Sequence, residues 1–505
     1  MKKINSNFSN RSSFLIFILI GFLSCSSDSF SENDPVVNTK SLATSSSNIE
    51  FDSSESTSDI NVTTDAEIWT INSSNASWLS FSQKSGTSGS TVVSITAAKN
   101  TGIAQRTAEV TLNATNATSL KITISQTGLP STSGIYPDYN TNPIEADAAG
   151  MSSSAQELAA KISLGWNIGN SLEAAGSETA WGNPKITKQL IDLVKQSGFN
   201  AVRIPCSWDQ YLSNNTTAEI KTDWLNRVKE VIQYCVENEM YVIVNIHWDG
   251  GWLENNVTES KKEENNAKQK AFWEQIAIHF RDFDEHLLFA SANEPNVEDA
   301  AQMAVLKTYH QTFIDAVRST GGKNAFRTLV VQGPSTDIEK TSTLMTTLPN
   351  DTAVDRMMVE VHYYTPYQFC LMSEDASWGN MFYYWGAGFH TTTDTERNAT
   401  WGEEADLKNY FKLMKDQFIT NGIPVILGEF AAMRRTTLTG DNLQLHLNSR
   451  AYYLKTVVKE AKTNGLLPFY WDAGGLENNG SGLFDRNTNT VFDTQALNAL
   501  LEGML

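Results

Sequence analysis

The sequence has few cysteines, few histidines and too few basic residues to balance its acids. Its 505 residues include four cysteines and seven histidines. No two cysteines have Cys-x-x-Cys spacing and no His-x-His pair occurs, so neither a zinc site nor a disulfide framework is indicated, and a metal mechanism is disfavoured. Buried free thiols are expected at Cys206, Cys235 and Cys370, in preference to one disulfide among the three.

The charge balance excludes one class of partner. Thirty-eight basic and 57 acidic residues give a formal net charge of −19, which argues against nucleic acid or an anionic lipid surface as a partner. A neutral polymer is indifferent to this charge. Thirteen Trp and 15 Tyr residues supply flat amphipathic rings of the kind that stack on sugars, although most of them are expected in a core.

Long hydrophobic runs are scarce, and one of them is N-terminal. The run FLIFILIGFL (14–23) follows a basic stretch and precedes Cys25. A membrane-spanning helix needs about 20 apolar residues, so the shorter run predicts an export signal over residues 1–24. The cysteine after it resembles the lipidated first residue of a bacterial lipoprotein. We therefore predict lipidation of Cys25, a tether over residues 25–40 and a location on the outer membrane at the cell surface; the alternative is ordinary secretion.

Residues 41–128 are rich in Ser and Thr and contain short stretches in which apolar and polar residues alternate. Such stretches, separated by Ser, Asn and Gly turns, predict a small immunoglobulin-like β-sandwich. The segment that includes WTINSSNASWLSFSQKSGTSGS and ends in ITISQTG resembles a BACON domain, a Bacteroidetes module. The family name suggests carbohydrate binding, but Trp69 and Trp78 are expected in the sandwich core, which favours a spacer role.

A segment that contains Pro, Gly and Asn (129–151) is interpreted as a linker. The pattern of apolar and polar residues changes after it. Between residues 152 and 505, eight apolar runs alternate with helix-like stretches, several of which end at Gly. This pattern predicts an α/β fold, a (β/α)₈ barrel. The runs are ISLGWNIG (162–169), NAVRIP (200–205), YVIVNIH (241–247), HLLFASANEP (286–295), TLVVQG (328–333), MMVEVHYY (357–364), PVILGEF (424–430) and LPFYWD (467–472).

Polar and aromatic side chains stand where most of these runs end. The carboxyl ends of the strands form the active-site face of such a barrel, so these side chains are expected to meet at one rim. They are Asn167, Asn170, Arg203, His247, Asn293, Glu294, His362, Tyr364, Glu429 and Trp471. The two histidines are expected to contact substrate or carboxylates.

Two of these residues, Glu294 and Glu429, can face each other across a bound chain. Hydrolysis of a glycosidic bond requires such a pair, because one carboxylate attacks the anomeric carbon and the other protonates the leaving oxygen. The acid needs a raised pKa and the nucleophile must stay ionised, so their surroundings are expected to differ. Arg203 suits the task of holding Glu429 ionised, and Tyr364 could donate a hydrogen bond to it. Asn293 could contact a sugar 2-hydroxyl.

Several short motifs resemble glycoside hydrolase family 5, a retaining family with this barrel. They are VRIP (202–205), NIH (245–247), NEP (293–295), HYY (362–364) and GEF (428–430), while GWNIGNSLEA (165–174) and ETAWGNP (178–184) resemble the subfamily 4 endoglucanases that cut β-1,4-glucans, including xyloglucan. The resemblance implies Glu294 as acid/base, Glu429 as nucleophile and no cofactor. Behind a lipoprotein signal, such a module resembles Bacteroidetes cell-surface xyloglucanases. One departure is Trp248, which stands where many relatives carry a second histidine.

Aromatic residues in the loops are candidates for sugar platforms. The family suggests that Trp471 lies beneath the sugar at the cleavage point. With Asn170, the residues expected to bind substrate are Trp181, Trp248, Trp252 and Trp385, each of which could instead pack a loop. The long aromatic-rich segment 365–405 is expected to build one wall of an open groove.

The sequence thus predicts a monomeric, retaining endo-β-1,4-glucanase, with xyloglucan as the favoured substrate. The rivals are a general endoglucanase, a mixed-linkage glucanase, a mannanase and a xylanase, because the motif residues recognise the cleavage point and not the branches. A protein of another class, a surface glycan-binding protein without activity, would be expected to lack the acid or the nucleophile, and both are present.

Overall fold

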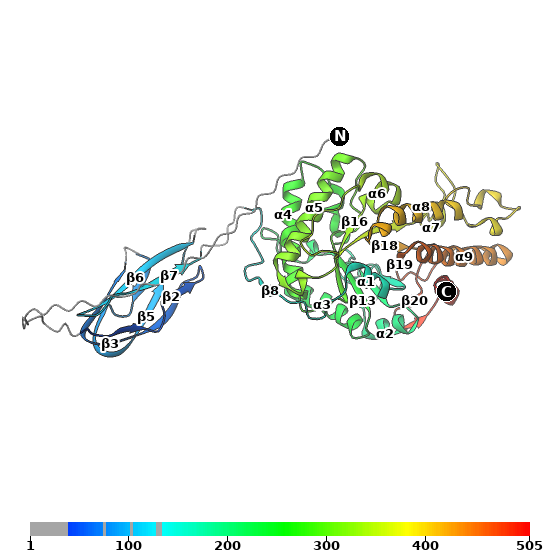
Figure 1. Cartoon of the computed structure of the whole chain (residues 1–505). Helices are drawn as coiled ribbons and strands as arrows, with labels where there is room; N and C mark the ends of the chain where they lie inside the picture. Colours follow the sequence, from blue (N-terminus) through cyan, green and yellow to red (C-terminus); the bar gives the residue numbers. More distant parts are fainter. Residues whose placement is uncertain (1–38, 74–76, 101–104, 128–133) are drawn as a thin grey trace, which may run out of the picture. The chain divides into compact units, whose positions relative to one another are not determined.

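The computed structural model of the chain describes residues 39–73, 77–100, 105–127 and 134–505. The chain divides into two compact units, residues 1–128 and 129–505 (Figure 1). The expected export signal and Cys25 lie outside the described residues. Among the residues that are described, no helix is long and apolar enough to cross a membrane.

In its described residues, the N-terminal unit is a β-sandwich of seven strands around one apolar core. The strands are β1 (Leu42–Thr44), β2 (Asn48–Phe51), β3 (Ser56–Ser73), β4 (Leu79–Phe81), β5 (Ser85–Ala97), β6 (Arg106–Ala114) and β7 (Leu120–Gln126). Their order is β2-β7-β6-β3-β5-β4, with β1 paired to β3. Along most of β3 buried and exposed side chains alternate, as expected for a strand with one face on a core. Trp69 is fully buried and Trp78 packs on the same core, so both residues have the expected packing role.

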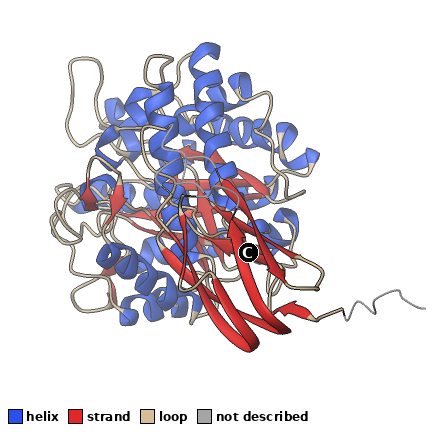
Figure 2. Cartoon of the chain, turned by 90° about the vertical axis from the view of Figure 1, so that its left-hand side faces the viewer, coloured by secondary structure: helices blue, strands red, loops and turns tan. Residues whose placement is uncertain are grey.

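The second unit is a closed barrel of eight parallel strands surrounded by helices (Figure 2). Every strand coincides with one of the eight predicted apolar runs, and most strand residues are buried, because the barrel interior covers one face and helices cover the other. Cys206, Cys235 and Cys370 are buried and free, as expected. In barrel order the strands are β10 (Ala201–Ile204), β13 (Tyr241–Asn245), β14 (Leu287–Ala290), β16 (Leu329–Gln332), β17 (Met357–Tyr363), β18 (Val425–Phe430), β19 (Leu466–Asp472) and β9 (Gly165–Ile168).

The helices begin and end where local sequence signals place them. At the first helix, Ser154 and Glu157 form a reciprocal capping box, and the helix before β19 ends at Gly465 in a left-handed conformation, which a residue without a Cβ adopts readily. The helices are α1 (Ala155–Lys161), α2 (Lys188–Gln196), α3 (Thr222–Val236), α4 (Lys262–Phe280), α5 (Ala300–Ser319), α6 (Ile338–Leu344), α7 (Tyr367–Cys370), α8 (Glu404–Gln417), α9 (Gly440–Asn464) and α10 (Thr494–Gly503).

Part of the segment interpreted as a linker, residues 129–151, packs on the barrel. The main-chain N–H of Tyr139 donates to Glu274 Oε2 at 2.7 Å, and its hydroxyl donates to the carbonyl oxygen of Thr217 at 2.8 Å. Strand β8 (Ile144–Ala146) pairs with β15 (Gly321–Gly322). The linker interpretation is therefore wrong for these residues. A composition rich in Pro, Gly and Asn is typical both of free linkers and of segments that hydrogen bonds hold against a domain surface. We call the segment 139–146, which is held in this way, the strap.

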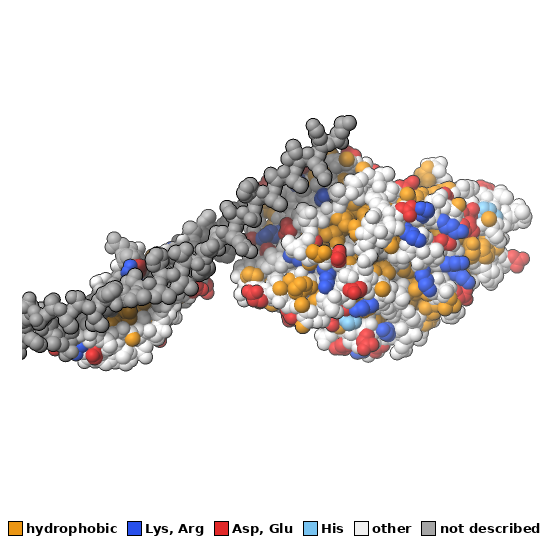
Figure 3. Space-filling view, in the orientation of Figure 1, with side chains coloured by type: hydrophobic (Ala, Val, Ile, Leu, Met, Phe, Trp, Pro, Cys, Tyr) orange, Lys and Arg blue, Asp and Glu red, His pale blue; other side chains and the backbone are white. Residues whose placement is uncertain are grey.

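The surface of the barrel unit mixes charges of both signs. On the face shown in Figure 3, acidic and basic side chains are interspersed. The barrel unit also contains two short hairpins. One pairs β11 (Leu212–Asn214) with β12 (Glu219–Ile220), and the other pairs β20 (Phe484–Asp485) with β21 (Thr490–Val491).

Candidate active site

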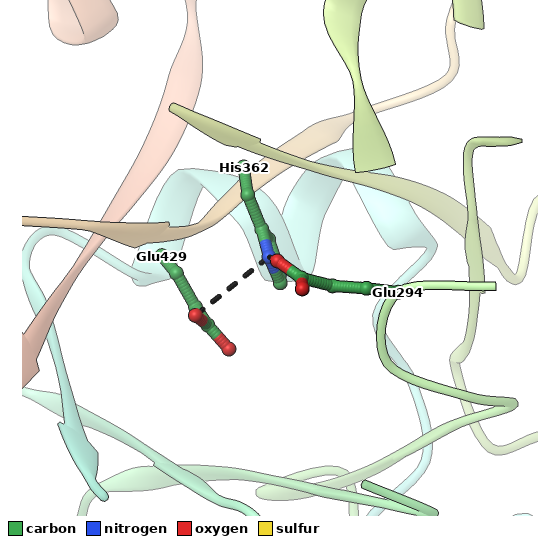
Figure 4. Close-up of side chains that lie close together, drawn as sticks. All are labelled: Glu294, His362 and Glu429. Atoms are coloured by element: carbon green, nitrogen blue, oxygen red, sulfur yellow. Dashed lines mark hydrogen bonds and ion pairs between the residues drawn. The ribbon is translucent and has the colours of Figure 1, made fainter. Parts of the chain in front are cut away.

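The ends of strands from around the barrel bring two glutamates and a histidine together. Glu294 follows β14, Glu429 lies in β18 and His362 lies in β17. An oxygen of each carboxylate and a ring nitrogen of His362 all lie within 4.8 Å of one another. In Figure 4 the two glutamate side chains approach each other from opposite sides and the imidazole ring lies beside both. The barrel thus unites residues that are far apart in the sequence.

Arg203 is the buried centre of the polar network beneath this cluster. Its Nη1 donates to Glu429 Oε1 at 2.7 Å and to Asn167 Oδ1 at 3.0 Å, and its Nη2 donates to Asn293 Oδ1 at 2.7 Å. Its Nε forms an ion pair with Glu360 Oε1 at 2.8 Å. Because the guanidinium is planar and rigid, these contacts hold the carboxylate of Glu429 in one orientation.

Glu429 is buried, and its second oxygen has its own partners. Tyr364 donates its hydroxyl hydrogen to Glu429 Oε2 at 2.9 Å, and His362 Nδ1 lies 3.7 Å from the same oxygen. Burial raises the pKa of Glu429, and the positive charges of His362 and Arg203 limit the rise. Glu429 is therefore oriented by donors on both oxygens.

His362 lies between three acids and is positively charged. Its Nδ1 contacts Glu294 Oε1 at 2.7 Å, and its Nε2 contacts Glu360 Oε1 at 3.1 Å. Burial alone would lower the pKa of His362, but Glu429, Glu294 and Glu360 raise it to about 10. Both ring nitrogens then carry protons at neutral pH and neither offers a lone pair. A metal ion could bind His362 in this cluster only by displacing one of these protons.

The protonation pattern differs from the one expected from the sequence. Burial favours a higher pKa for Glu294, but its contact with the charged His362 ring outweighs burial and lowers the pKa. In the protein alone, the contact with His362 thus favours the ionised form of Glu294. The side chain of Glu294 is 43% exposed, so its surroundings change when a ligand covers it.

Glu360 belongs to this network although its sequence context did not single it out. Its carboxylate is fully buried, accepts a hydrogen bond from Gln332 Nε2 at 2.7 Å and contacts Arg203 and His362. A Cβ on Gly428 would lie 2.2 Å from Glu360 Oε1, so only glycine fits before Glu429. The signal in the sequence was an acid inside the apolar run MMVEVHYY, which an uncharged strand interior would not contain.

A cavity of about 500 Å³ lies at the carboxyl ends of β9, β18 and β19. Asn170, Trp181 and Trp471 line it, together with the loop after β19. The ring of Trp471 is nearly parallel to that of His247, with ring centroids 5.8 Å apart. Burial lowers the pKa of His247, so this ring is neutral. Three of the residues selected from the sequence thus line one cavity, and a fourth, His247, stacks against one of the three.

The prediction that Trp385 binds substrate is wrong. Its side chain is fully buried, its ring centroid lies 5.0 Å from that of Tyr453, and its Nε1 donates to the carbonyl oxygen of Gly402. Trp385 therefore fastens the long segment 365–405 to α9.

Trp252 also has a packing role. Its Nε1 donates to Asp249 Oδ2 at 2.9 Å, and its ring meets the ring of Phe272 edge-on. Trp248, on the same loop, is 45% exposed and free to contact a ligand. Sequence alone could not separate the two, because both follow the same strand.

A second cavity, of about 260 Å³, lies on the β16–β17 side of the cluster. Of the residues that line it, only His362 was selected from the sequence. The cavity is lined by Asp337, Ile338, Glu339, His362, Tyr363, Thr365, Trp401 and Tyr410. Trp401 is 44% exposed and belongs to the aromatic-rich segment expected to form a wall. A larger cavity, of about 550 Å³, lies at the opposite end of the barrel strands, near α1 and Pro468, and contains no pair of acids.

A (β/α)₈ barrel with two facing carboxylates at the carboxyl ends of its strands, and cavities on both sides of them, defines a glycoside hydrolase of the barrel class. Residues 167–477 match the family model described as Cellulase (glycosyl hydrolase family 5), and residues 41–129 match the model described as Viral BACON domain. The chain belongs to glycosyl hydrolase family 5 and carries a BACON domain before its catalytic barrel. Its reaction is therefore retaining.

One relative spans both units of the chain, and others match a smaller share of it. The xyloglucan-specific endo-beta-1,4-glucanase of Bacteroides ovatus is 35% identical over 97% of this chain and 95% of that protein. Among solved structures, a xyloglucan-specific beta-1,4-glucanase from a ruminal metagenomic library, in complex with XXLG, matches with a TM-score of 0.65 and 41% identity over 70% of this chain and 96% of that chain. A broad-specificity endoglucanase from Bacteroides salanitronis matches with a TM-score of 0.63 and 34% identity over 72% and 98%.

Proposed function

We propose that the chain is an endo-β-1,4-glucanase that cuts xyloglucan, with Glu429 as nucleophile and Glu294 as acid/base. The observation that carries the proposal is that one oxygen of Glu294 lies within 4.8 Å of one oxygen of Glu429. Retaining glycosidases hold these groups about 5–5.5 Å apart, whereas inverting enzymes leave about 6.5–9.5 Å for a water molecule.

In the first step, Glu429 attacks the anomeric carbon while Glu294 protonates the departing oxygen. Arg203 and Tyr364 orient the nucleophile. A sugar chain that covers the half-exposed Glu294 removes water from it, and desolvation raises the pKa of a carboxyl group. Substrate binding thus favours the protonated acid that the resting site, with its charged His362, does not hold.

In the second step, Glu294 takes a proton from water, and the water oxygen attacks the anomeric carbon and displaces the carboxylate of Glu429. Esterification removes the negative charge of Glu429, which in the free site opposes ionisation of its neighbour. The ionised form of Glu294 is then favoured, as a base requires. Two inversions at the anomeric carbon retain its configuration.

The two cavities suit an internal position on a long chain. Trp471, Trp181 and Asn170 would hold the sugars on the side of the attacked carbon, and Trp401 would contact the sugars that depart. Aromatic faces and neutral polar groups recognise uncharged sugars. Binding space on both sides of the cleavage point supports endo action.

The preference for xyloglucan rests on the relatives and is tested by a substrate panel. The protein without residues 1–40 is assayed for reducing-end release on xyloglucan, mixed-linkage glucan, carboxymethyl cellulose, glucomannan and xylan at equal mass. We expect xyloglucan to be cut at least about tenfold faster than the linear glucans. A preference for linear glucans identifies a general endoglucanase instead. If no substrate is cut, the protein is instead a glycan-binding protein without activity. Glu429→Gln serves as the inactive control.

We further propose that the enzyme is a monomer tethered to the outer membrane by lipid on Cys25, with the BACON domain as a spacer. The support is the apolar run 14–23, which is separated from Cys25 by one serine, and the core position of Trp69. Metabolic labelling with an alkyne fatty acid should mark the wild type and not Cys25→Ser. Equal labelling of both proteins contradicts the anchor.

A further inference from the structure

A second acid, Glu254, lies behind the acid Glu294 and holds its main chain. Glu254 Oε1 accepts the main-chain N–H of Glu294 at 2.7 Å, and the main-chain oxygen of Glu254 accepts the N–H of Asn296 at 2.9 Å. The residue between these two donors is Pro295, which has no N–H. Glu254 therefore binds both N–H groups available in the segment 294–296.

The carboxylate of Glu254 is held in an environment that does not favour it. The residue is 6% exposed. Burial raises its pKa to about 7; the N–H of Glu294 and the side chain of Asn293 oppose the rise, and the negative charges of Glu294 and Glu429 add to it. A buried acid beside two other acids destabilises the fold when ionised. When ionised, Glu254 thus keeps its contacts with the active-site segment at a cost in folding free energy.

The loop that carries Glu254 is fixed independently of Glu294. Asp249 accepts hydrogen bonds from the N–H groups of Trp208 and Asp209 at 2.8 and 2.9 Å and from Trp252 Nε1. At the other end of the loop, the main-chain oxygen of Asn256 accepts a hydrogen bond from α4 and another from α5. The two oxygens of Glu254 that accept hydrogen bonds from Glu294 and Asn296 therefore have a fixed position, and they hold the chain after β14 in place.

By contrast, the side chain of Glu294 has little to hold it. It is half exposed, and His362 Nδ1 is its hydrogen-bond partner. The direction in which its carboxyl group points depends on the main chain at Glu294. Misplacement of a reacting group by about 1 Å costs about 100-fold in rate.

We propose that Glu254 is a positioning residue, which aims the carboxyl group of Glu294 at the glycosidic oxygen by fixing the main chain from 294 to 296. The inference rests on the proposed role of Glu294 as the acid. It assigns to Glu254 no proton transfer and no contact with the sugar.

Leaving groups that need different degrees of protonation test this role. Glu254→Ala and Glu254→Gln are compared on xyloglucan and on two aryl cello-oligosaccharides, one with a phenyl and one with a 2,4-dinitrophenyl leaving group. The dinitrophenolate departs without a proton. We expect Glu254→Ala to lower kcat/KM about 100-fold on the polymer and the phenyl substrate, and far less on the dinitrophenyl substrate. Glu254→Gln keeps an acceptor oxygen and should restore most of the loss.

Glu274 provides a matched control. It is buried to a similar degree, and its Oε2 accepts the N–H groups of Tyr139 and Asn140 at 2.7 and 3.2 Å, on the strap that packs on α4. Glu274→Ala should lower stability without a change that depends on the leaving group. Glu254→Asp, which keeps the acid and withdraws it by one methylene, should show the leaving-group dependence even where the alanine variant fails to fold.

Three results would overturn the proposal: equal losses on both aryl substrates, a glutamine variant as impaired as the alanine variant, or unchanged polymer kinetics. Glu294→Ala separates this outcome from failure of the proposed function. If Glu294 is the acid, that variant loses the polymer and keeps the dinitrophenyl substrate, whatever Glu254 does. A wild type that cuts none of these substrates refutes the function itself.

Discussion

Replacing Glu360 by Gln tests whether one buried carboxylate organises the catalytic groups. The substitution keeps the size of the side chain and removes its charge. Glu360 Oε1 lies 2.8 Å from Arg203 Nε and 3.1 Å from His362 Nε2, inside the barrel. Two unit charges 4 Å apart attract by about 4 kcal/mol at an effective dielectric constant of 20. Removing one partner of a buried ion pair costs about 3–5 kcal/mol.

We expect a loss at the lower end of this range, about 3 kcal/mol in the free energy of unfolding at pH 7. Arg203 keeps its bond to Glu429, and the amide of Gln still offers an acceptor oxygen. His362 loses one of the three acids that raise its pKa, so its pKa falls. Each unit corresponds to about 1.4 kcal/mol, and the alkaline limb of the kcat/KM profile should therefore move by at least about one pH unit toward acid.

The assays are denaturant unfolding followed by tryptophan fluorescence, and pH–rate profiles on xyloglucan. Glu263→Gln, on the exposed side of α4 and outside both active-site cavities, is the control and should change stability by less than about 0.5 kcal/mol. If Glu360→Gln behaves like this control in both assays, Glu360 does not organise the site and the reasoning is refuted.

Three further predictions concern stability, substrate contact and pH. Gly428→Ala places a Cβ 2.2 Å from Glu360 Oε1 and should cost about 1–3 kcal/mol in thermal unfolding; added to Glu360→Ala, it should cost less than it does in the wild type. Trp401→Ala should lower kcat/KM on xyloglucan about tenfold through lost apolar contact, whereas Trp378→Ala, 64% exposed outside both active-site cavities, should not. His362 holds its proton to about pH 10 when folded and to about 6.5 when unfolded, so its contribution to stability is complete below pH 6.5 and is lost as pH rises to 10, by about 1.4 kcal/mol per unit. Unfolding of wild type and His362→Gln at pH 6, 8 and 9.5 checks the slope, and parallel curves contradict it.

The barrel and the two facing glutamates followed from local patterns. A strand buried on both faces must be apolar along its length, and its first polar residue marks the end that reaches the rim. The runs that end at His247, Glu294 and Glu429 therefore located both the strands and the face that carries the chemistry. Because the carboxyl ends of all strands lie at one face of a closed barrel, the fold class by itself predicts that these residues come together.

The residues that were missed or misassigned depend on neighbours that the sequence does not name. Trp385 and Trp401 lie in the same aromatic-rich segment, and α9 decides that the first is buried while the second remains open to ligand. The strap at Tyr139 packs because Glu274, on a distant helix, accepts its N–H. The composition of a segment does not reveal which distant residues it contacts in the folded chain.

Periodicity and chemistry along the chain were thus sufficient for the fold class, the strand ends and the pair of acids, since each depends on residues that are close in sequence. Protonation and positioning depended on folding. The charge of His362, the lowered pKa of Glu294 and the hold of Glu254 on its main chain arise from acids that converge from separate strands and loops in a space without water. Electrostatic interactions of that kind depend on distance and burial, and both quantities exist only once the barrel has closed.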